Sequence, residues 1–196
     1  MFSLRILAAG FLLTITGCQE RKAAQVATKL GSQAVAPKLV MDTSRVAVLP
    51  YDKKQNAYIF QVYDEKLGES IPQVVKPASL SSAELAQVKV LLRACIDEYN
   101  QAQVIELQKL RKAQPNEVFK ADNFIINLPK YKRQLVAVIN TKGEKEVWVN
   151  CFSHELYKMD WHHEIAFWHD GGNCLFNVRI NLTKRKWCDL MVNGSA

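Results

Sequence analysis

The spacing of apolar residues changes once along this chain, and that change constrains the fold more than any other feature. Between Ser81 and Pro115 the apolar side chains recur at steps of three and four, the period of an α-helix with one buried face. Ser81 and Glu84 match a capping box, and Leu80 and Leu85 occupy the flanking staple positions. The sequence therefore predicts one long helix that starts at Ser81 and ends at Pro115. Its apolar stripe comprises Leu85, Val88, Leu92, Cys95 and Tyr99.

After Asn116 the apolar residues alternate with polar ones, which is typical of strands with one buried side. Turn residues separate the alternating segments, above all Gly143 and the run 170–173. We therefore expect an antiparallel meander of about five strands after the helix. The candidate strands are 124–128 (a short one), 135–139, 146–151, 164–168, 174–182 and 187–192.

Ahead of the helix, apolar residues alternate on both sides of a polar turn at 52–56, at Val46 and Val48 and then from Tyr58 to Val62. This pattern predicts an N-terminal hairpin. The expected fold class is then α+β: one long helix packed on a curved antiparallel sheet, preceded by that hairpin.

The last predicted hairpin has a preferred register. Pairing Ile180 with Leu190 across a three-residue loop at 184–186 puts the apolar residues of both strands on one side, whereas a shift of one residue would bury Asp189. The same register turns Cys174 and Cys188 toward the core.

The N-terminal sequence has the pattern of an export signal. Arg5 is followed by an apolar run over 6–15, and Cys18 comes after Thr-Gly, which is the pattern of a bacterial lipoprotein signal. An ordinary secretory signal with an incidental cysteine is the competing interpretation. The run is far shorter than the ~20 residues that a membrane-spanning helix requires. We expect cleavage of 1–17, acylation of Cys18, an anchor and flexible stalk over 18–44, and a single domain over 45–196.

Such a signal would place the domain in the cell envelope, with the membrane as a partner through the lipid. Gln19 rather than Asp after the cysteine favours the outer membrane over the inner. Losing Arg5 with the signal lowers the net charge from +7 to +6, which favours anionic neighbours. The basic residues are scattered along the chain, so a nucleic-acid partner is not expected.

The cysteines other than Cys18 fall on the predicted inward faces. They are Cys95, Cys151, Cys174 and Cys188. An even number outside the cytoplasm is typical of structural disulfides, and three pairings are open. Inward thiols lack the exposure that a catalytic thiolate needs, so we expect disulfides or inert buried thiols and no catalytic cysteine.

Every histidine falls between His154 and His169. Imidazoles are zinc ligands, but the adjacent His162 and His163 would point to opposite faces of a strand, and no helical zinc motif is present. The sequence therefore predicts no metal site and no cofactor. An envelope hydrolase, or a thiol- or metal-dependent enzyme that uses this segment, is the alternative hypothesis.

The outward side of the predicted strands collects aromatic and amide side chains. Tryptophan offers a flat apolar surface and amides offer paired donors and acceptors, a combination suited to a sugar or an extended peptide. The candidate binding residues are Trp148, Asn150, Asn177, Arg179, Asn181 and Trp187. The alternative is that the N-terminal hairpin covers this side, or that it simply faces water.

Several stretches of the second half, taken together, resemble a group of small uncharacterised exported proteins and lipoproteins of the Bacteroidota. They are 131–134, 143–152, 170–174, 181–183 and 192–194, and Asp-Gly-Gly-Asn-Cys at 170–174 is the most specific. The resemblance covers roughly residues 75–196. It implies a single α+β domain and brings no established activity or catalytic residues.

The order of helix and meander is also similar to a cystatin-like layout, which implies a peptidase inhibitor. That function would need the Gln-x-Val-x-Gly loop of the family, and the sequence lacks this loop. The expected function is a non-catalytic envelope lipoprotein that contacts an envelope protein or a glycan.

Overall fold

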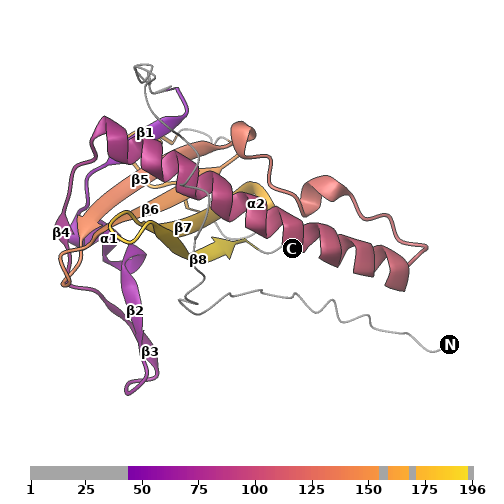
Figure 1. Ribbon diagram of the computed structural model, residues 1–196, viewed down its shortest axis with the longest axis horizontal. Coiled ribbons are helices and arrows are strands. Elements are labelled where there is room, and N and C mark those ends of the chain that lie inside the picture. Colours follow the sequence, from indigo (N-terminus) through magenta and orange to yellow (C-terminus); the bar gives the residue numbers. More distant parts are fainter. Residues whose placement is uncertain (1–43, 155–158, 168–170, 194–196) are drawn as a thin grey trace, which may run out of the picture.

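The computed structural model describes residues 44–154, 159–167 and 171–193. Its centre is a six-stranded sheet in the order β1-β5-β6-β7-β8, with β4 on the same edge of β5 as β1. Neighbouring strands are antiparallel except β1, which runs parallel to β5. Figure 1 shows the helix α2 (Ser82–Ala113) across one face of this sheet. The strands are β1 (Val46–Leu49), β4 (Lys76–Pro77), β5 (Lys132–Ile139), β6 (Lys145–Phe152), β7 (Leu175–Asn181) and β8 (Lys186–Val192).

The helix α2 begins and ends where its sequence predicts. Ser81 and Glu84 form both bonds of the capping box: the Ser81 N–H donates to Glu84 Oε2 at 2.8 Å, and Ser81 Oγ accepts the Glu84 N–H at 3.3 Å. At the other end the Gln114 N–H donates to the Leu110 carbonyl, just before Pro115. The buried face comprises Val88, Leu91, Leu92, Cys95, Ile96 and Leu107. The predicted α+β class is confirmed.

The strands 135–139, 146–151 and 187–192 are also confirmed, within β5, β6 and β8. In the turn between β5 and β6, Gly143 has a φ of +74°, as its place in a tight hairpin requires.

Both faces of the sheet are covered. On the α2 side, Leu135 and Val149 belong to the core beneath the helix. On the other side, Val136 and Trp148 pack against Phe60, which is fully buried. In β6 every residue except Lys145 is buried, and such continuous burial is typical of a central strand packed on two sides.

The predicted N-terminal hairpin is wrong. β1 joins the main sheet beside β5, and the chain then forms the short helix α1 (Lys53–Asn56) and a 3₁₀ turn, Ala57–Ile59. A separate hairpin follows, made of β2 (Gln61–Asp64) and β3 (Glu69–Pro72), and it projects from the body in Figure 1. Alternation predicted the strand at 46–49 and only the end of the second strand, since 58–60 are not in a strand; it did not predict the partners, because pairing depends on distant residues.

Two of the predicted strands are also wrong. Residues 124–128 and the described part of 164–168 form turns and loops, whereas Trp168 lies outside the described residues. In the second segment, the Glu164 N–H donates to the Asp160 carbonyl, and the Ala166 N–H donates to the Gln134 side chain. These backbone groups are therefore not available for pairing with a neighbouring strand.

The register of the last hairpin differs from the prediction. Ile180 lies opposite Trp187 rather than Leu190, and the register shifts farther along the pair. The turn between the strands spans 182–185 instead of 184–186, and it sets this pairing; beyond it a β-bulge gives β8 one extra residue, with Asp189 at a φ of +53°. Trp187 and Leu190 therefore both pack on the α2 side, while Cys188 lies opposite Arg179.

Candidate functional site

The outward sheet face predicted as a binding surface is covered. Trp148, Asn150 and Asn181 are buried, Asn177 and Arg179 are half-buried, and Trp187 lies on the opposite face, where it packs on the α2 side. The prediction of an open face is therefore wrong, and the competing expectation that another segment covers it is closer to the structure. The covering residues come from 47–60 and from 159–166.

Two buried amides hold the segment 161–166 on this face. Gln134 is fully buried, and its Nε2 donates to the carbonyls of Trp161 and Glu164, each at 2.6 Å. Its Oε1 accepts the Ala166 N–H at 2.8 Å, and Asn150 Nδ2 donates to the Ala166 carbonyl at 2.6 Å. The amides therefore serve as partners for loop backbone, which explains why polar residues are stable at the centre of the sheet.

Arg179 has the same role for the other covering segment. Its guanidinium donates to the carbonyls of Ile59 and Gln61, lies over the Phe60 ring with 5.6 Å from Cζ to the ring centroid, and pairs with Asp189 at 3.6 Å. Trp148 Nε1 donates to Asn177 Oδ1 at 3.2 Å. These predicted binding residues hold the fold together.

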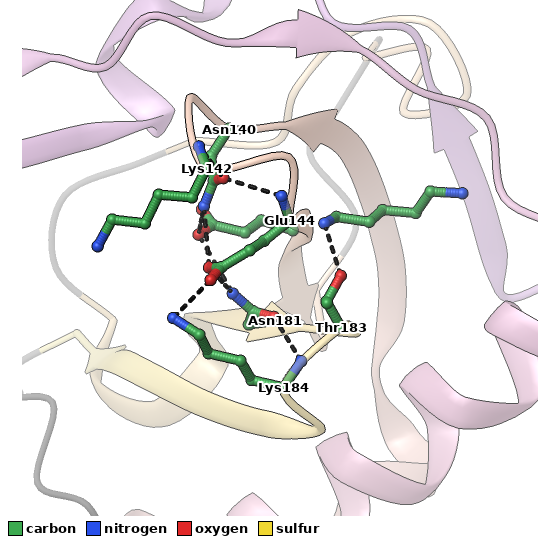
Figure 2. Close-up of polar contacts among 8 residues, drawn as sticks. Asn140, Lys142, Glu144, Asn181, Thr183 and Lys184 are labelled. Carbon is green, nitrogen blue, oxygen red and sulfur yellow. Dashed lines mark hydrogen bonds and ion pairs between the residues drawn. The ribbon is translucent and has the colours of Figure 1, made fainter.

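Asn181 belongs to a polar cluster that joins the β5–β6 turn to the β7–β8 turn. Figure 2 shows Asn140, Asn181 and Lys184 around Glu144. Asn181 Nδ2 donates to Glu144 Oε2 at 2.9 Å, and Lys184 Nζ pairs with Glu144 Oε1 at 2.6 Å. The Lys184 hydrogen bond is the main reason that the Glu144 pKa falls to about 2.

The carboxylates of this cluster face donors on the protein itself. Asn140 Nδ2 reaches Glu144 at 3.2 Å and Glu146 at 2.7 Å. Glu146 Oε2 has no hydrogen-bond partner among the described residues. Amide N–H groups and an ammonium donate to these carboxylates, so the cluster links the two turns.

A cleft of about 760 Å³ lies on the α2 side of the molecule, within the range of roughly 300–1,000 Å³ typical of ligand sites. One wall is α2, which contributes Arg93 and Asp97. The opposite wall is the segment 122–131, which connects the helix to β5. Ser153 and His154, which follow β6, and Asn173 and Cys174, which precede β7, also line it.

The walls of the cleft are fixed by hydrogen bonds between segments far apart in the sequence. Asn100 on α2 donates to the Ile126 carbonyl at 2.9 Å and accepts the Ile126 N–H at 2.8 Å. Tyr131 Oη donates to the Asn173 carbonyl at 2.7 Å, and Asn173 Nδ2 donates to the Asp122 carbonyl at 2.8 Å. Burial, more than any other cause, raises the Tyr131 pKa to about 12, so this phenol stays protonated as a donor.

Charges of both signs line the cleft without partners. Arg93, Asp97, Asp122 and Lys130 make no ion pair within the described ranges. Sequence reasoning missed these residues because they come from segments with no shared motif. The available signal was the group of polar residues Lys120, Asp122, Asn123 and Asn127 between the helix and the first long strand, since connecting loops often carry binding residues.

The candidate disulfide cysteines occur as free thiols in the structure. Cys95 on α2 and Cys151 on β6 are buried in the core between helix and sheet as predicted, and burial raises the pKa of Cys95 to about 12 and that of Cys151 well above its ordinary value. Cys174 is half-buried and lines the cleft. Cys188 does not face the core, because the bulge turns it beside Asp189, to which its Sγ donates at 3.5 Å.

The histidines do not come together. His154 borders the cleft, with Nδ1 3.0 Å from Ser153 Oγ, whereas His162 and His163 are exposed. His163 Nδ1 lies 2.8 Å from Asp160 Oδ2, and this hydrogen bond is the main cause that lowers the Asp160 pKa. No cluster of metal-binding side chains occurs among the residues that the structure describes, and His169 lies outside them.

No helix in the described residues has an apolar stretch long enough to cross a bilayer, and Cys18 lies outside those residues. Comparisons with protein families, with curated proteins and with solved structures find no match to this chain.

Proposed function

We propose that this chain is a membrane-anchored bacterial envelope lipoprotein, and that its domain is a non-catalytic binding module with its ligand site in the cleft beside α2. The export pattern that ends at Cys18 supports the anchor. The cleft supports binding, because it combines a suitable volume with polar groups that have no partner in the described chain. The cleft is the observation on which the binding function depends.

The cleft fits a binding role better than the sheet face does. Gln134, Asn150 and Arg179 already bond to covering backbone, so a ligand on that face would first have to displace the covering segments. Asn123 and Asn127, in contrast, line the cleft and their side chains make no hydrogen bond within the described part of the chain. They can pair with a ligand without breaking a contact of the fold.

A change at the acylation site tests the anchor. We expect the full chain to fractionate with membranes and the Cys18→Ala variant to lose that association, because one thiol carries the lipid. Membrane association of the variant equal to that of the unchanged chain would contradict the anchor.

A photocrosslinking amino acid tests the site in cells. We place benzoylphenylalanine at Asn123, on the rim of the cleft, and at Val118, which is 87% exposed and outside it, as the matched control. An adduct of defined mass at Asn123 and none at Val118 is expected. Equal labelling at both positions, or no adduct at Asn123, would refute a ligand site in the cleft.

One observation favours a second candidate, a thiol-dependent enzyme. Cys174, Ser153 and His154 line the same cleft, so a thiol and an imidazole would face the same ligand. Iodoacetamide labelling of the native protein, mapped by peptide, tests this. An enzyme requires Cys174 to react faster than an unstructured cysteine peptide; a slower rate leaves the cleft with binding alone.

A further inference from the structure

We propose that the ligand of the α2 cleft is a short peptide with a free ammonium group and a free carboxylate. This inference rests on the proposed binding function and adds the chemical class of the ligand. It follows from the arrangement of charge, amide and apolar groups in the cleft.

Each wall of the cleft carries one positive and one negative side chain. The helix wall has Arg93 and, one turn later, Asp97. The loop wall has Asp122 and Lys130. Within the described residues none of the four has an oppositely charged partner within 4.0 Å. A ligand in the cleft can therefore pair with a basic or an acidic side chain on either wall.

This charge pattern excludes simpler ligands on energetic grounds. A polyanion would meet Asp97 and Asp122, and a polycation would meet Arg93 and Lys130. A neutral sugar would cover the four charges without pairing them, and covering an unpaired charge is unfavourable. A ligand with one ammonium and one carboxylate pairs with one side chain of each sign, and the other acidic and basic side chains, which are exposed, can stay in contact with water.

The remaining lining fits a peptide backbone with small side chains. Asn123 and Asn127 each offer a donor and an acceptor, the pair that a peptide group needs. Ile96, Ile126 and Leu128 also line the cleft and are themselves buried, so they provide a rigid apolar floor. Short aliphatic side chains would contact that floor while the chain ends reach the charged walls.

Calorimetric titration of the full chain with tri-alanine tests the proposal. At neutral pH this probe carries both terminal charges. We expect binding with a Kd below about 1 mM. N-acetylation removes the ammonium and C-amidation removes the carboxylate, and each should weaken binding by about tenfold or more, because charge-assisted bonds are lost.

Variants of the helix wall identify the contacts. Arg93→Gln should weaken the binding of tri-alanine but not of its C-amide, and Asp97→Asn should weaken the binding of tri-alanine but not of its N-acetyl form. Lys89→Gln and Glu98→Gln are matched controls, because both residues are exposed on the same helix but outside the cleft. They should leave the affinities for tri-alanine and for its two blocked forms unchanged. All four positions are exposed, so the variants keep the fold.

The outcomes separate this inference from the proposed function. Binding of the neutral sugar chitotriose with no binding of tri-alanine would overturn the peptide assignment and leave the binding function in place. Equal affinity for blocked and free tri-alanine, or no binding of tri-alanine at all, would also overturn it. The absence of a crosslink at Asn123 in cells would instead refute the function on which the inference rests.

Discussion

The replacement Gln134→Leu should destabilise the protein strongly, because it removes the bonds that hold the covering segment on the sheet. Gln134 is fully buried and serves three backbone groups, the carbonyls of Trp161 and Glu164 and the N–H of Ala166. Leucine fills a similar volume but leaves these groups without a partner. Each buried unsatisfied group costs about 1–3 kcal/mol, and since part of the segment can reach water, we expect a total loss of about 3 kcal/mol.

Urea denaturation and amide hydrogen exchange measure this effect. A loss of about 3 kcal/mol raises the unfolded fraction roughly a hundredfold, and exchange at the Ala166 amide should accelerate because it loses its acceptor. Gln101→Leu is the control, since Gln101 is exposed on α2 and its replacement should change stability by less than about 0.5 kcal/mol. A loss below about 1 kcal/mol with unchanged exchange at Ala166 would show that Gln134 does not hold the segment.

Three further predictions concern the helix and the last hairpin. The Lys145 hydrogen bond is the main cause that lowers the Glu84 pKa from 4.5 to about 2 in the folded protein. The pair therefore stabilises the fold above about pH 5, and this contribution is lost as the pH falls toward 2. Glu84→Gln should therefore cost about 1 kcal/mol at pH 7 and reduce the acid dependence of the unfolding free energy; an unchanged pH profile would contradict this. Arg185 is exposed and has a φ of +53°, a conformation that glycine adopts more easily than arginine. Arg185→Gly should therefore raise the unfolding free energy by about 0.5 kcal/mol in urea denaturation, and a lower unfolding free energy would contradict this. Leu92→Ala should lower the unfolding free energy by about 3 kcal/mol in the same assay, because Leu92 is buried in the core between α2 and the sheet. Val90 is exposed on the same helix, so the control Val90→Ala should change the unfolding free energy by less than about 0.5 kcal/mol. Equal effects of the two replacements would contradict the assigned helix face.

The elements that the sequence predicts well are those whose signals are local. The capping box at Ser81 predicted the start of α2, and Pro115 predicted its end. Gly143 in a short turn predicted the β5–β6 hairpin in the same way.

The failures have a common physical cause, which is dependence on distant residues. β1 alternates as a hairpin strand would, yet it pairs with β5, more than eighty positions away in the chain. Gln134 and Asn150 have the polarity of surface residues, but their partners lie in a loop that covers the sheet. The bulge at Asp189 changes the face of Cys188, and alternation of residue types gave no sign of it.

The candidate cleft was the least predictable feature. Its residues come from α2, from the connecting segment and from the ends of β6 and β7, and no spacing in the sequence links them. Only contacts such as the Tyr131 to Asn173 hydrogen bond bring these segments together. A shared site of this kind is visible only once the fold is known.

The location in the envelope, and with it the range of available ligands, depends on how the N-terminus is processed. Mass spectrometry of the N-terminal peptide from membrane-purified protein tests this most directly. The account predicts a mature chain that begins at Cys18 and carries acyl groups on that residue. A chain that still begins at Met1, or an unmodified Cys18, would contradict it.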